Sequence, residues 1–269
     1  LTEDVKNKVI ACRKKVEVMA SSNRAIYGIN TGFGPLCDVQ ITNEQTNKLQ
    51  ENLLITHAVG VGNPIDKKLS KLMMICKVHA LCQGYSGIRL KVIERILFFI
   101  ENNLLPLVPE QGSVGASGDL APLSHLFLPL IGEGEFLIDN QIFVAKKVLE
   151  DYGLKPIQLK AKEGLALING TQFILAHTIT GLKKMEYLLD LADVAGAMSI
   201  EGYQGSSSPF RDELHQLRPF KGNIEVAERM FMLLYKSQNV DSHEDCERVQ
   251  DPYSMRCIPQ VHGASRNAY

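Results

Sequence analysis

The sequence is organised around one segment, Gly112-Ser113-Val114-Gly115-Ala116-Ser117-Gly118-Asp119-Leu120-Ala121-Pro122-Leu123. Its three glycines permit close backbone approach and positive φ angles, so they specify an unusual backbone path rather than an ordinary helix or strand. Taken alone, the glycines are typical of a turn before a helix. A phosphate-binding loop is less favoured, because the segment lacks the Gly-Lys-Ser or Gly-Lys-Thr ending and no strand clearly precedes it.

The tripeptide Ala116-Ser117-Gly118 in this segment is also suited to react with itself. With no side chain at position 118, the Gly118 amide nitrogen can be pressed onto the Ala116 carbonyl carbon, and a five-membered ring can close. Loss of one water from the ring and of the Ser117 hydroxyl as a second water would leave an exocyclic methylidene, which is a strong electrophile. The apolar stretch 120–131 predicts a helix that begins just beyond Gly118, and the partial positive charge of its N-terminus would enhance that electrophile.

The composition indicates a globular protein that acts on a small molecule. The 269 residues are 45% hydrophobic and 22% charged, and the formal net charge of -1 argues against a general nucleic-acid or membrane surface. The six cysteines form no C-x-x-C pair, so we expect no metal site and reduced thiols in a cytoplasmic protein. Because no signal sequence opens the chain and no apolar run reaches about 18 residues, we expect neither secretion nor a membrane span. The chain begins at Leu1 and ends at Tyr269 in mid-pattern, so we expect it to belong to a longer polypeptide.

The hydrophobic pattern predicts a mainly α protein. Apolar residues recur at helical spacing over 2–20, 67–83 and 89–102, and a dense apolar stretch predicts one long buried helix from 171 to about 202. The strand signal is limited to at most a small β-hairpin around Asp139-Asn140. We therefore expect a loop-rich N-terminal domain, residues 1–145, followed by the start of a central bundle of long helices, residues 146–269.

Three polar side chains lie in loops or at helix ends, where an ordinary structural role competes with a functional one. Tyr27 lies among the glycines of 28–34, where an aromatic plug under a turn is the ordinary interpretation. His57 lies near the C-terminus of a helix that a capping box at Thr42 begins, so it is a favourable partner of the helix dipole. Asn169 precedes Gly170, where an amide either caps the following helix or binds a ligand.

A second group of polar side chains lies near the end of the sequence. Gln250, Tyr253 and Arg256 place an amide, a phenol and a guanidinium within seven residues. Such a set can hold the α-carboxylate of an amino acid, because a guanidinium matches the geometry of a carboxylate. A surface salt bridge is the ordinary alternative for Arg256.

Taken together, five segments resemble the motifs of the aromatic amino acid lyase and aminomutase family. They read YGINTGFG, NLLITHAVGVG, GSVGASGDLAPLSH, KEGLALINGTQ and VQDPYSMRCIPQVHG, and they occur in the family's order. The resemblance covers nearly the whole sequence. In that family the Ala-Ser-Gly tripeptide cyclises to a 4-methylideneimidazol-5-one, which implies that Ala116, Ser117 and Gly118 form this group, with Asp119 as a candidate helper in ring closure and no external cofactor.

The resemblance also implies roles for the other polar residues. Tyr27 would be the base that removes a β-proton, a role that requires surroundings favouring the phenolate. His57 would contact the substrate ring, and Arg256 would pair with the substrate carboxylate. Asn169, Gln250 and Tyr253 would shape and support the ring and the substrate, with Tyr253 close enough to the chemistry to be a catalytic candidate.

The pair Thr56-His57 and the wording around Arg256 resemble the histidine-type members of the family. They imply the non-oxidative elimination of ammonia from L-histidine to give trans-urocanate. A tyrosine or phenylalanine ammonia-lyase, or an aminomutase, is the alternative within the family. The family also implies a homotetramer in which several subunits build each active site. Because family members continue beyond the end of this sequence, a noncatalytic helical fragment or interaction subunit is a further alternative.

Overall fold

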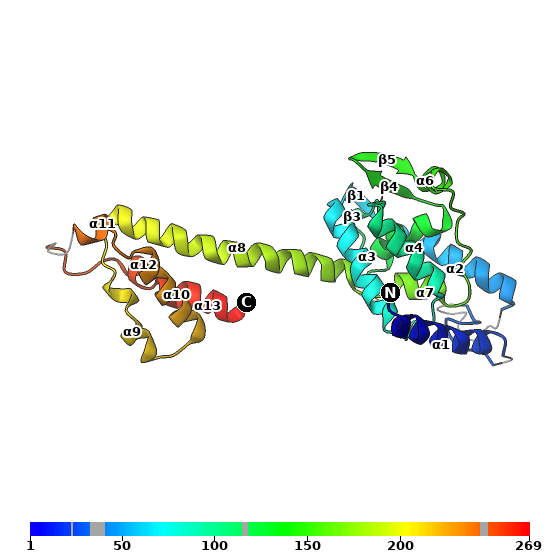
Figure 1. Ribbon diagram of the computed structural model, residues 1–269, viewed down its shortest axis with the longest axis horizontal. Coiled ribbons are helices and arrows are strands. Elements are labelled where there is room, and N and C mark those ends of the chain that lie inside the picture. The colour runs from blue at the N-terminus through cyan, green and yellow to red at the C-terminus, as the bar shows by residue number, and fades with distance from the viewer. Residues whose placement is uncertain (23, 33–40, 115–117, 243–246) are drawn as a thin grey trace. The chain divides into compact units, whose positions relative to one another are not determined.

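The structure is a computed structural model of residues 1–269 that describes all of them except 23, 33–40, 115–117 and 243–246 (Figure 1). The described residues form two compact units, Leu1–Thr178 and Ile179–Tyr269, which we call unit 1 and unit 2. Helices dominate both units, so the predicted mainly α class is confirmed. The four cysteines among the described residues, Cys12, Cys76, Cys82 and Cys257, are free thiols.

Unit 1 consists of helices connected by loops and short strands. Its helices are α1 (Glu3–Ala20), α2 (Asn43–His57), α3 (Lys67–Cys82), α4 (Leu90–Glu101), α5 (Leu120–Phe127), the 3-10 helix η2 (Leu128–Ile131), α6 (Ala145–Asp151), α7 (Glu163–Ile168) and the start of α8 (Gln172–Tyr203). The capping box at Thr42 is present, because the Thr42 side chain accepts from the Gln45 backbone and the Gln45 side chain accepts from the Thr42 backbone. The helices expected at 2–20, 67–83 and 89–102 are confirmed to within a few residues.

The strands form more than the single hairpin that the sequence predicts. The hairpin itself is confirmed, with β4 (Glu135–Ile138) antiparallel to β5 (Gln141–Val144), but β2 (Leu105–Pro106) extends it to three strands in the order β2-β4-β5. A second pair joins β1 (Val61–Pro64) to β3 (Pro109–Gln111). These extra strands are two to four residues long and contain proline, so they are too short to show a two-residue alternation of polarity.

The hydrophobic core of unit 1 explains where this unit ends. Fully buried Phe99 and Phe136 meet edge to face, with ring centroids 5.0 Å apart, and join α4 to the three-stranded sheet. The same core includes residues well beyond the boundary expected after 145, among them Val148, Leu149 and Leu167. The compact units divide at Thr178, because α6, α7 and the first residues of α8 bury their apolar side chains in the first core.

Unit 2 contains the remainder of α8 and a set of shorter helices. They are the 3-10 helix η3 (Ser208–Phe210), α9 (Asp212–Gln216), α10 (Lys221–Leu233), α11 (Gln238–Asp241), α12 (Tyr253–Arg256) and α13 (Ile258–Ala268). Helices α10 and α13 lie side by side (Figure 1). Their backbones are so close that a Cβ on Gly222 would lie 2.2 Å from the Gly263 carbonyl oxygen. The glycines at these two positions allow this approach.

A buried ionic cluster connects three helices of unit 2. The carboxylate of Asp193 on α8 is fully buried, and it lies 2.8 Å from His262 Nδ1 and 2.6 Å from an Arg266 nitrogen, both on α13. Arg229 on α10 approaches the same carboxylate at 3.1 Å. Hydrogen bonding to Arg266, together with the charge of Arg229, lowers the pKa of the neighbouring Asp190. The cluster therefore fixes α13 against α8 through charge-assisted hydrogen bonds and α10 against α8 through the ion pair of Arg229.

The long helix expected from 171 to about 202 is present as α8, but the expectation that it is buried is wrong, because much of its apolar surface is exposed. Among the described residues, the helical stretch 163–203 is long and apolar enough to meet a length and composition criterion for a membrane span, with a mean hydropathy of 1.2. This stretch was not predicted as a candidate span, because the prediction required an uninterrupted apolar run and polar residues interrupt this helix. The criterion is weak evidence for a membrane, because core helices of soluble proteins also meet it. Many apolar side chains of α8 are exposed, including Tyr187, Leu188 and Met198.

Candidate functional site

Gly118 packs directly against the backbone of Gly170. Its φ is +86°, and a Cβ at this position would lie 2.3 Å from the Gly170 carbonyl oxygen, far inside van der Waals contact. The Asp119 amide, one residue on, donates a hydrogen bond to that same oxygen at 2.6 Å. Position 118 therefore accepts glycine alone, for both its backbone angle and its space. Ala116 and Ser117, the other two residues of the predicted ring, lie outside the described residues.

The carboxylate of Asp119 ties this segment to the start of α8. The side chain is fully buried, and its Oδ1 accepts from the Ser113 hydroxyl at 2.6 Å. Its Oδ2 accepts from the amides of Phe173 and Ile174, both at 3.0 Å, in the first turn of α8. Helix α5 begins immediately after Asp119, as expected. Gly118 thus lies just before the N-terminus of α5 and beside that of α8, where the Asp119 carboxylate already accepts from two first-turn amides.

Asn169 and Gly170 form the turn that faces Gly118. Asn169 is the residue at which α7 ends, and its side chain is exposed. Its carbonyl oxygen accepts a hydrogen bond of 2.9 Å from Nζ of Lys77 on α3. Gly170 has a φ of +156°, and a Cβ there would lie 2.3 Å from the side-chain oxygen of Gln172. The positive φ favours glycine at position 170, whereas the contact with the end of the Gln172 side chain can be relieved by a movement of that side chain.

The hydrogen bonds of His57 determine which ring nitrogen carries its proton. His57 is the last residue of α2, as expected, and its Nδ1 lies 2.9 Å from the Leu53 carbonyl oxygen. A carbonyl can only accept, so Nδ1 carries the hydrogen and Nε2 has a lone pair in the neutral ring. The Thr56 hydroxyl, which donates to the Asn52 carbonyl at 2.8 Å, lies 3.2 Å from the same Nδ1.

The chain that follows His57 is held beside the start of the Gly112 segment. The Gly60 amide donates to Nε2 of His125 on α5 at 3.0 Å, and a Cβ on Gly112 would lie 3.2 Å from the Gly60 Cα. Burial lowers the pKa of His125, which keeps its ring neutral and able to accept this hydrogen bond. The strand pair β1-β3 continues the contact, with Val61 opposite Gln111. The structure therefore brings the His57 segment and the glycine-rich segment into one region of unit 1.

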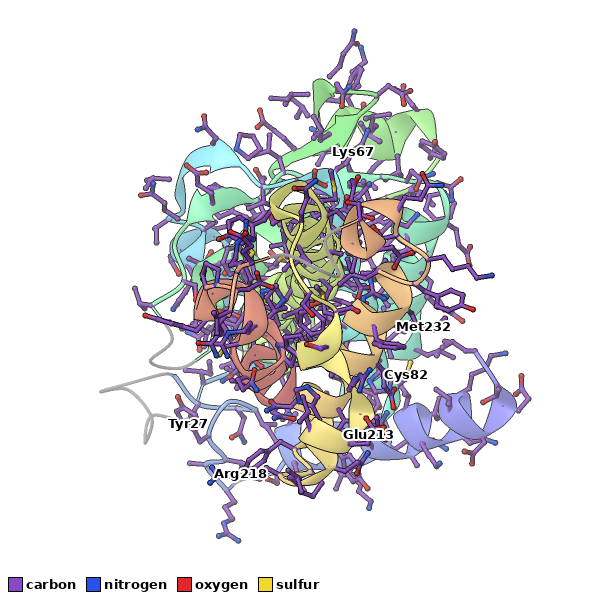
Figure 2. The ribbon with its side chains drawn as sticks, turned by 90° about the vertical axis from the view of Figure 1, so that its left-hand side faces the viewer. Tyr27, Lys67, Cys82, Glu213, Arg218 and Met232 are labelled. Carbon is purple, nitrogen blue, oxygen red and sulfur yellow. The ribbon has the colours of Figure 1, made fainter. Side chains whose placement is uncertain are left out.

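Tyr27 lies in a loop of unit 1 that Asn30 organises. The Tyr27 side chain is 59% exposed (Figure 2). Asn30 is buried, and its side-chain oxygen accepts from the Ile26 amide at 2.8 Å while its nitrogen donates to the Arg24 carbonyl at 2.9 Å. These bonds fold the backbone on either side of Tyr27 into a defined loop.

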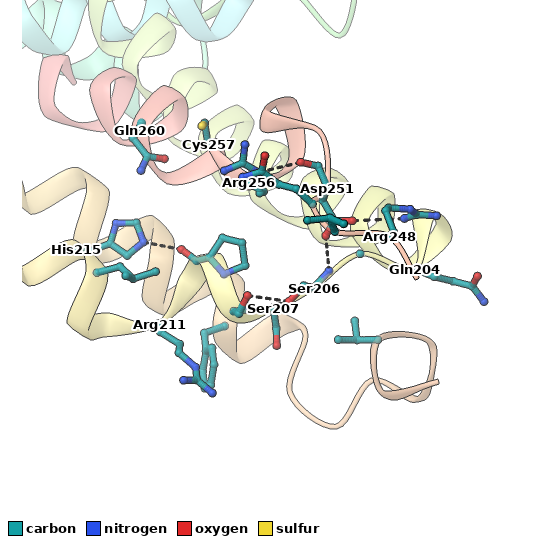
Figure 3. Close-up of a pocket in the computed structure, with 18 of the residues that line it drawn as sticks. Gln204, Ser206, Ser207, Arg211, His215, Arg248, Asp251, Arg256, Cys257 and Gln260 are labelled. Atoms are coloured by element: carbon teal, nitrogen blue, oxygen red, sulfur yellow. Dashed lines mark hydrogen bonds and ion pairs between the residues drawn. The ribbon is translucent and has the colours of Figure 1, made fainter. Parts of the chain in front are cut away.

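Unit 2 brings Gln250 and Arg256 together. Arg256 Nε donates to the Asp251 carbonyl at 2.8 Å (Figure 3), and the Gln250 amide oxygen, when turned toward the guanidinium, accepts from both terminal nitrogens at 3.2 and 3.3 Å. Both residues line an open pocket of about 1160 Å³. Tyr253, the first residue of α12, is 75% exposed and does not line this pocket.

Sequence reasoning missed two supporting residues of unit 1. Lys77 lies four residues from both Met73 and Leu81, so it belongs to the buried side of its helix. A lysine among these apolar residues was the sequence feature that could have identified it. His125 carried no comparable signal, because its partner Gly60 is far away in the sequence. Within the described part of the chain, no group of three or more His, Cys, Asp or Glu side chains is placed to hold a metal ion.

The chain is similar to proteins of known activity over its whole length. The sequence model described as aromatic amino acid lyase matches residues 1–269. Histidine ammonia-lyase from Myxococcus xanthus is 47% identical over 266 residues, which are 99% of this chain and 52% of that protein. The crystal structure of histidine ammonia-lyase from Trypanosoma cruzi has a TM-score of 0.86 at 38% identity and covers 99% of this chain and 49% of that one. Tyrosine aminomutase from Streptomyces globisporus has a TM-score of 0.87 at 31% identity, covering 99% and 54%. The chain spans about half the length of the curated relatives it matches.

Proposed function

Because this chain belongs to the aromatic amino acid lyase family, we propose that the protein containing it is a histidine ammonia-lyase, which eliminates ammonia from L-histidine to give trans-urocanate. The observation that carries the proposal is the contact between Gly118 and Gly170, which keeps the Gly118 side of the tripeptide free of any side chain. The identity of 47% to a histidine ammonia-lyase supports the substrate.

The described residues fit a 4-methylideneimidazol-5-one formed from Ala116, Ser117 and Gly118. The ring bond needs an unhindered nitrogen at position 118, and the backbone of Gly170 occupies the space that a Cβ would fill. When formed, this group supplies an electrophilic methylidene that converts the substrate amine into a leaving group. The N-terminus of α5, which begins two residues after Gly118, favours the negative charge that such an electrophile accumulates.

The remaining residues bind the substrate and move its proton. The Arg256 guanidinium, oriented by the Asp251 carbonyl and Gln250, pairs with the substrate carboxylate. Nε2 of His57 accepts from the N–H of the substrate imidazole, because the Leu53 carbonyl takes the hydrogen on Nδ1. Tyr27 Oη removes the β-proton, the electron pair of the broken C–H bond forms the Cα–Cβ double bond, and the C–N bond breaks to release ammonia.

Two further residues support this arrangement, and the assembly completes it. Asn169 and Tyr253 contact the ring and the substrate. We propose a cytoplasmic homotetramer whose subunits share active sites, and the exposed apolar side chains of α8 support an assembly that covers them. No metal or separate cofactor takes part in the proposed reaction.

One experiment tests the electrophile and the substrate together. The intact mass of the protein should fall short of its sequence mass by two water molecules, and Ser117→Ala should restore the full mass. The unmodified mass in the wild-type protein contradicts the proposed group. L-Histidine should give the ultraviolet absorbance of urocanate, whereas tyrosine and phenylalanine should give no product.

An aminomutase or a tyrosine or phenylalanine ammonia-lyase is the second candidate, because a tyrosine aminomutase shares the fold of this chain at a TM-score of 0.87. Ammonia or a β-amino acid formed from tyrosine or phenylalanine, but not from histidine, would establish it. A noncatalytic subunit is the remaining alternative from the sequence, and it predicts the unmodified mass together with no turnover of any of the three amino acids.

A further inference from the structure

Lys77 on α3 is buried where a lysine is seldom found. Its exposed fraction is 2%, and it shares the buried side of α3 with Met73, Met74 and Leu81. Lysine rarely lies fully inside a protein unless a partner compensates for the loss of water. Apolar packing alone does not explain a lysine at this position, because methionine or leucine would fill the same space.

The partner of Lys77 is a backbone carbonyl rather than a carboxylate. Nζ donates to the Asn169 carbonyl oxygen at 2.9 Å, and among the described residues no carboxylate forms an ion pair with it. Burial without an opposite charge lowers the pKa of Lys77 to about 7. Burial of the Lys77 ammonium is unfavourable, and its one hydrogen bond in the part of the chain that the structure describes joins Nζ to the carbonyl oxygen of Asn169, the C-cap residue of α7.

That hydrogen bond acts on the surface that shapes the glycine-rich segment. Asn169 is followed by Gly170, whose carbonyl oxygen accepts from the Asp119 amide and touches Gly118. The side chain of Asn169 projects from the same turn. A shift of the Asn169 carbonyl would therefore move both the backbone that confines Gly118 and a side chain proposed to bind the ring.

We propose that Lys77 is a positioning residue that fixes the Asn169-Gly170 turn against Gly118, and thereby controls both closure of the ring from residues 116–118 and the placement of the Asn169 amide. The inference rests on the proposed function, because it concerns the same reacting tripeptide. Ring closure joins the Gly118 nitrogen to the Ala116 carbonyl carbon with loss of water. Its rate depends steeply on the approach of these two atoms, since a displacement of about 1 Å can cost on the order of 100-fold.

The test compares two lysines that each donate to a distant backbone carbonyl. Lys77→Met removes the hydrogen bond to Asn169 and keeps a side chain of similar length. Lys162→Met is the matched control, because Lys162 Nζ donates to the Ser86 carbonyl at 2.8 Å, outside the Asn169-Gly170 turn. Both variants and the wild type are made as the complete protein that contains this chain by cell-free synthesis, and the loss of two waters is followed by intact mass at intervals after translation is stopped.

Lys77→Met should fold with a cooperative urea transition and yet lose water on the order of 100-fold more slowly than the wild type. Lys162→Met should mature at the wild-type rate. In the Lys77→Met molecules that have matured, kcat for histidine should fall while KM stays within about twofold, because Arg256 and His57 are unchanged. A merely structural lysine would alter the urea midpoint and leave both the maturation rate and kcat per matured subunit unaffected.

Maturation of Lys77→Met at the wild-type rate with unchanged kcat overturns the inference. If Lys77→Met does not fold, Lys77→Gln takes its place, because its amide ends one atom short of the lysine nitrogen, and the same two outcomes apply. A wild-type protein that never loses two waters overturns the proposed function, and this inference with it.

Discussion

At the scale of single residues, two glycines and one lysine determine the backbone contact beside the tripeptide that we propose to react. Gly118 and Gly170 contact each other through their backbones, each has a positive φ, and the backbone of Gly170 leaves no room for a Cβ at position 118. Lys77 holds the turn that carries Gly170. A side chain at position 118 is excluded by the Gly170 backbone, and the Gly170 turn is held by the buried Lys77. Small changes at these positions should therefore slow the loss of two waters more than they lower the free energy of unfolding.

Gly118→Ala should abolish the loss of two waters. The new Cβ would lie 2.3 Å from the Gly170 oxygen, so the backbone must shift, and the positive φ adds a conformational cost of about 1–3 kcal/mol. Gly153→Ala is the matched control, because Gly153 has a φ of +65° with open space around its Cβ position. The intact mass of both variants tests this prediction, and the Gly153→Ala protein should still lose two waters. A Gly118→Ala protein that also loses two waters would refute the steric argument.

Lys77 also gives the stability of unit 1 a characteristic pH dependence. Its pKa is about 7 in the folded protein and 10.5 ordinarily, so the unfolded chain binds the proton more tightly between these values. Stability rises with pH wherever the unfolded state binds more protons. The wild type should therefore gain stability relative to Lys77→Met by about 1.4 kcal/mol per pH unit from about pH 7 upward, with no relative change below pH 7. Urea unfolding at pH 6, 7, 8 and 9 measures this difference, and a flat difference above pH 7 would show that the lysine is not desolvated.

At the scale of elements, α13 depends on its charges as well as on its apolar side. Arg266 is one partner of the fully buried Asp193, so Arg266→Met should destabilise the protein by about 3–5 kcal/mol through the charge left behind. Lys183→Met is the control, because its pair with Glu186 is exposed and should contribute less than about 0.5 kcal/mol. Chemical denaturation of both variants tests this prediction, and equal effects would mean that the buried cluster adds no stability.

The elements also show what the sequence could and could not predict. Long helices such as α1, α3 and α8 were found because many apolar residues repeat at helical spacing. The strands β1 and β3 were missed because so few residues carry no period, and their pairing depends on contacts between Val61 and Gln111.

The candidate site divides in the same way. Tyr27, His57, Asn169 and Arg256 stand in motifs whose residue types signal their chemistry, so sequence alone can nominate them. Lys77 and His125 act through backbone partners that are distant in sequence, Asn169 and Gly60, and no local pattern encodes such pairs. Residues that touch a substrate are chosen for their functional groups, whereas residues that position them are chosen for geometry, which becomes visible in the fold.

At the scale of the whole molecule, α8 presents apolar side chains that its own chain leaves uncovered, and the proposed homotetramer would bury them. Leu188→Glu, at a position that is 55% exposed, should weaken the assembly at least ~10-fold, because burying an unpaired carboxylate at an interface costs more than 1.4 kcal/mol. Val18→Glu on α1 is the control, at a position 71% exposed on a helix outside the proposed bundle. Light scattering after size exclusion measures the mass of each complete variant protein. Dissociation of the Leu188 variant alone would support α8 as the interface. A tetramer that persists in both variants would mean that Leu188 does not lie in the subunit interface, and α8 would then not be the element that holds the subunits together.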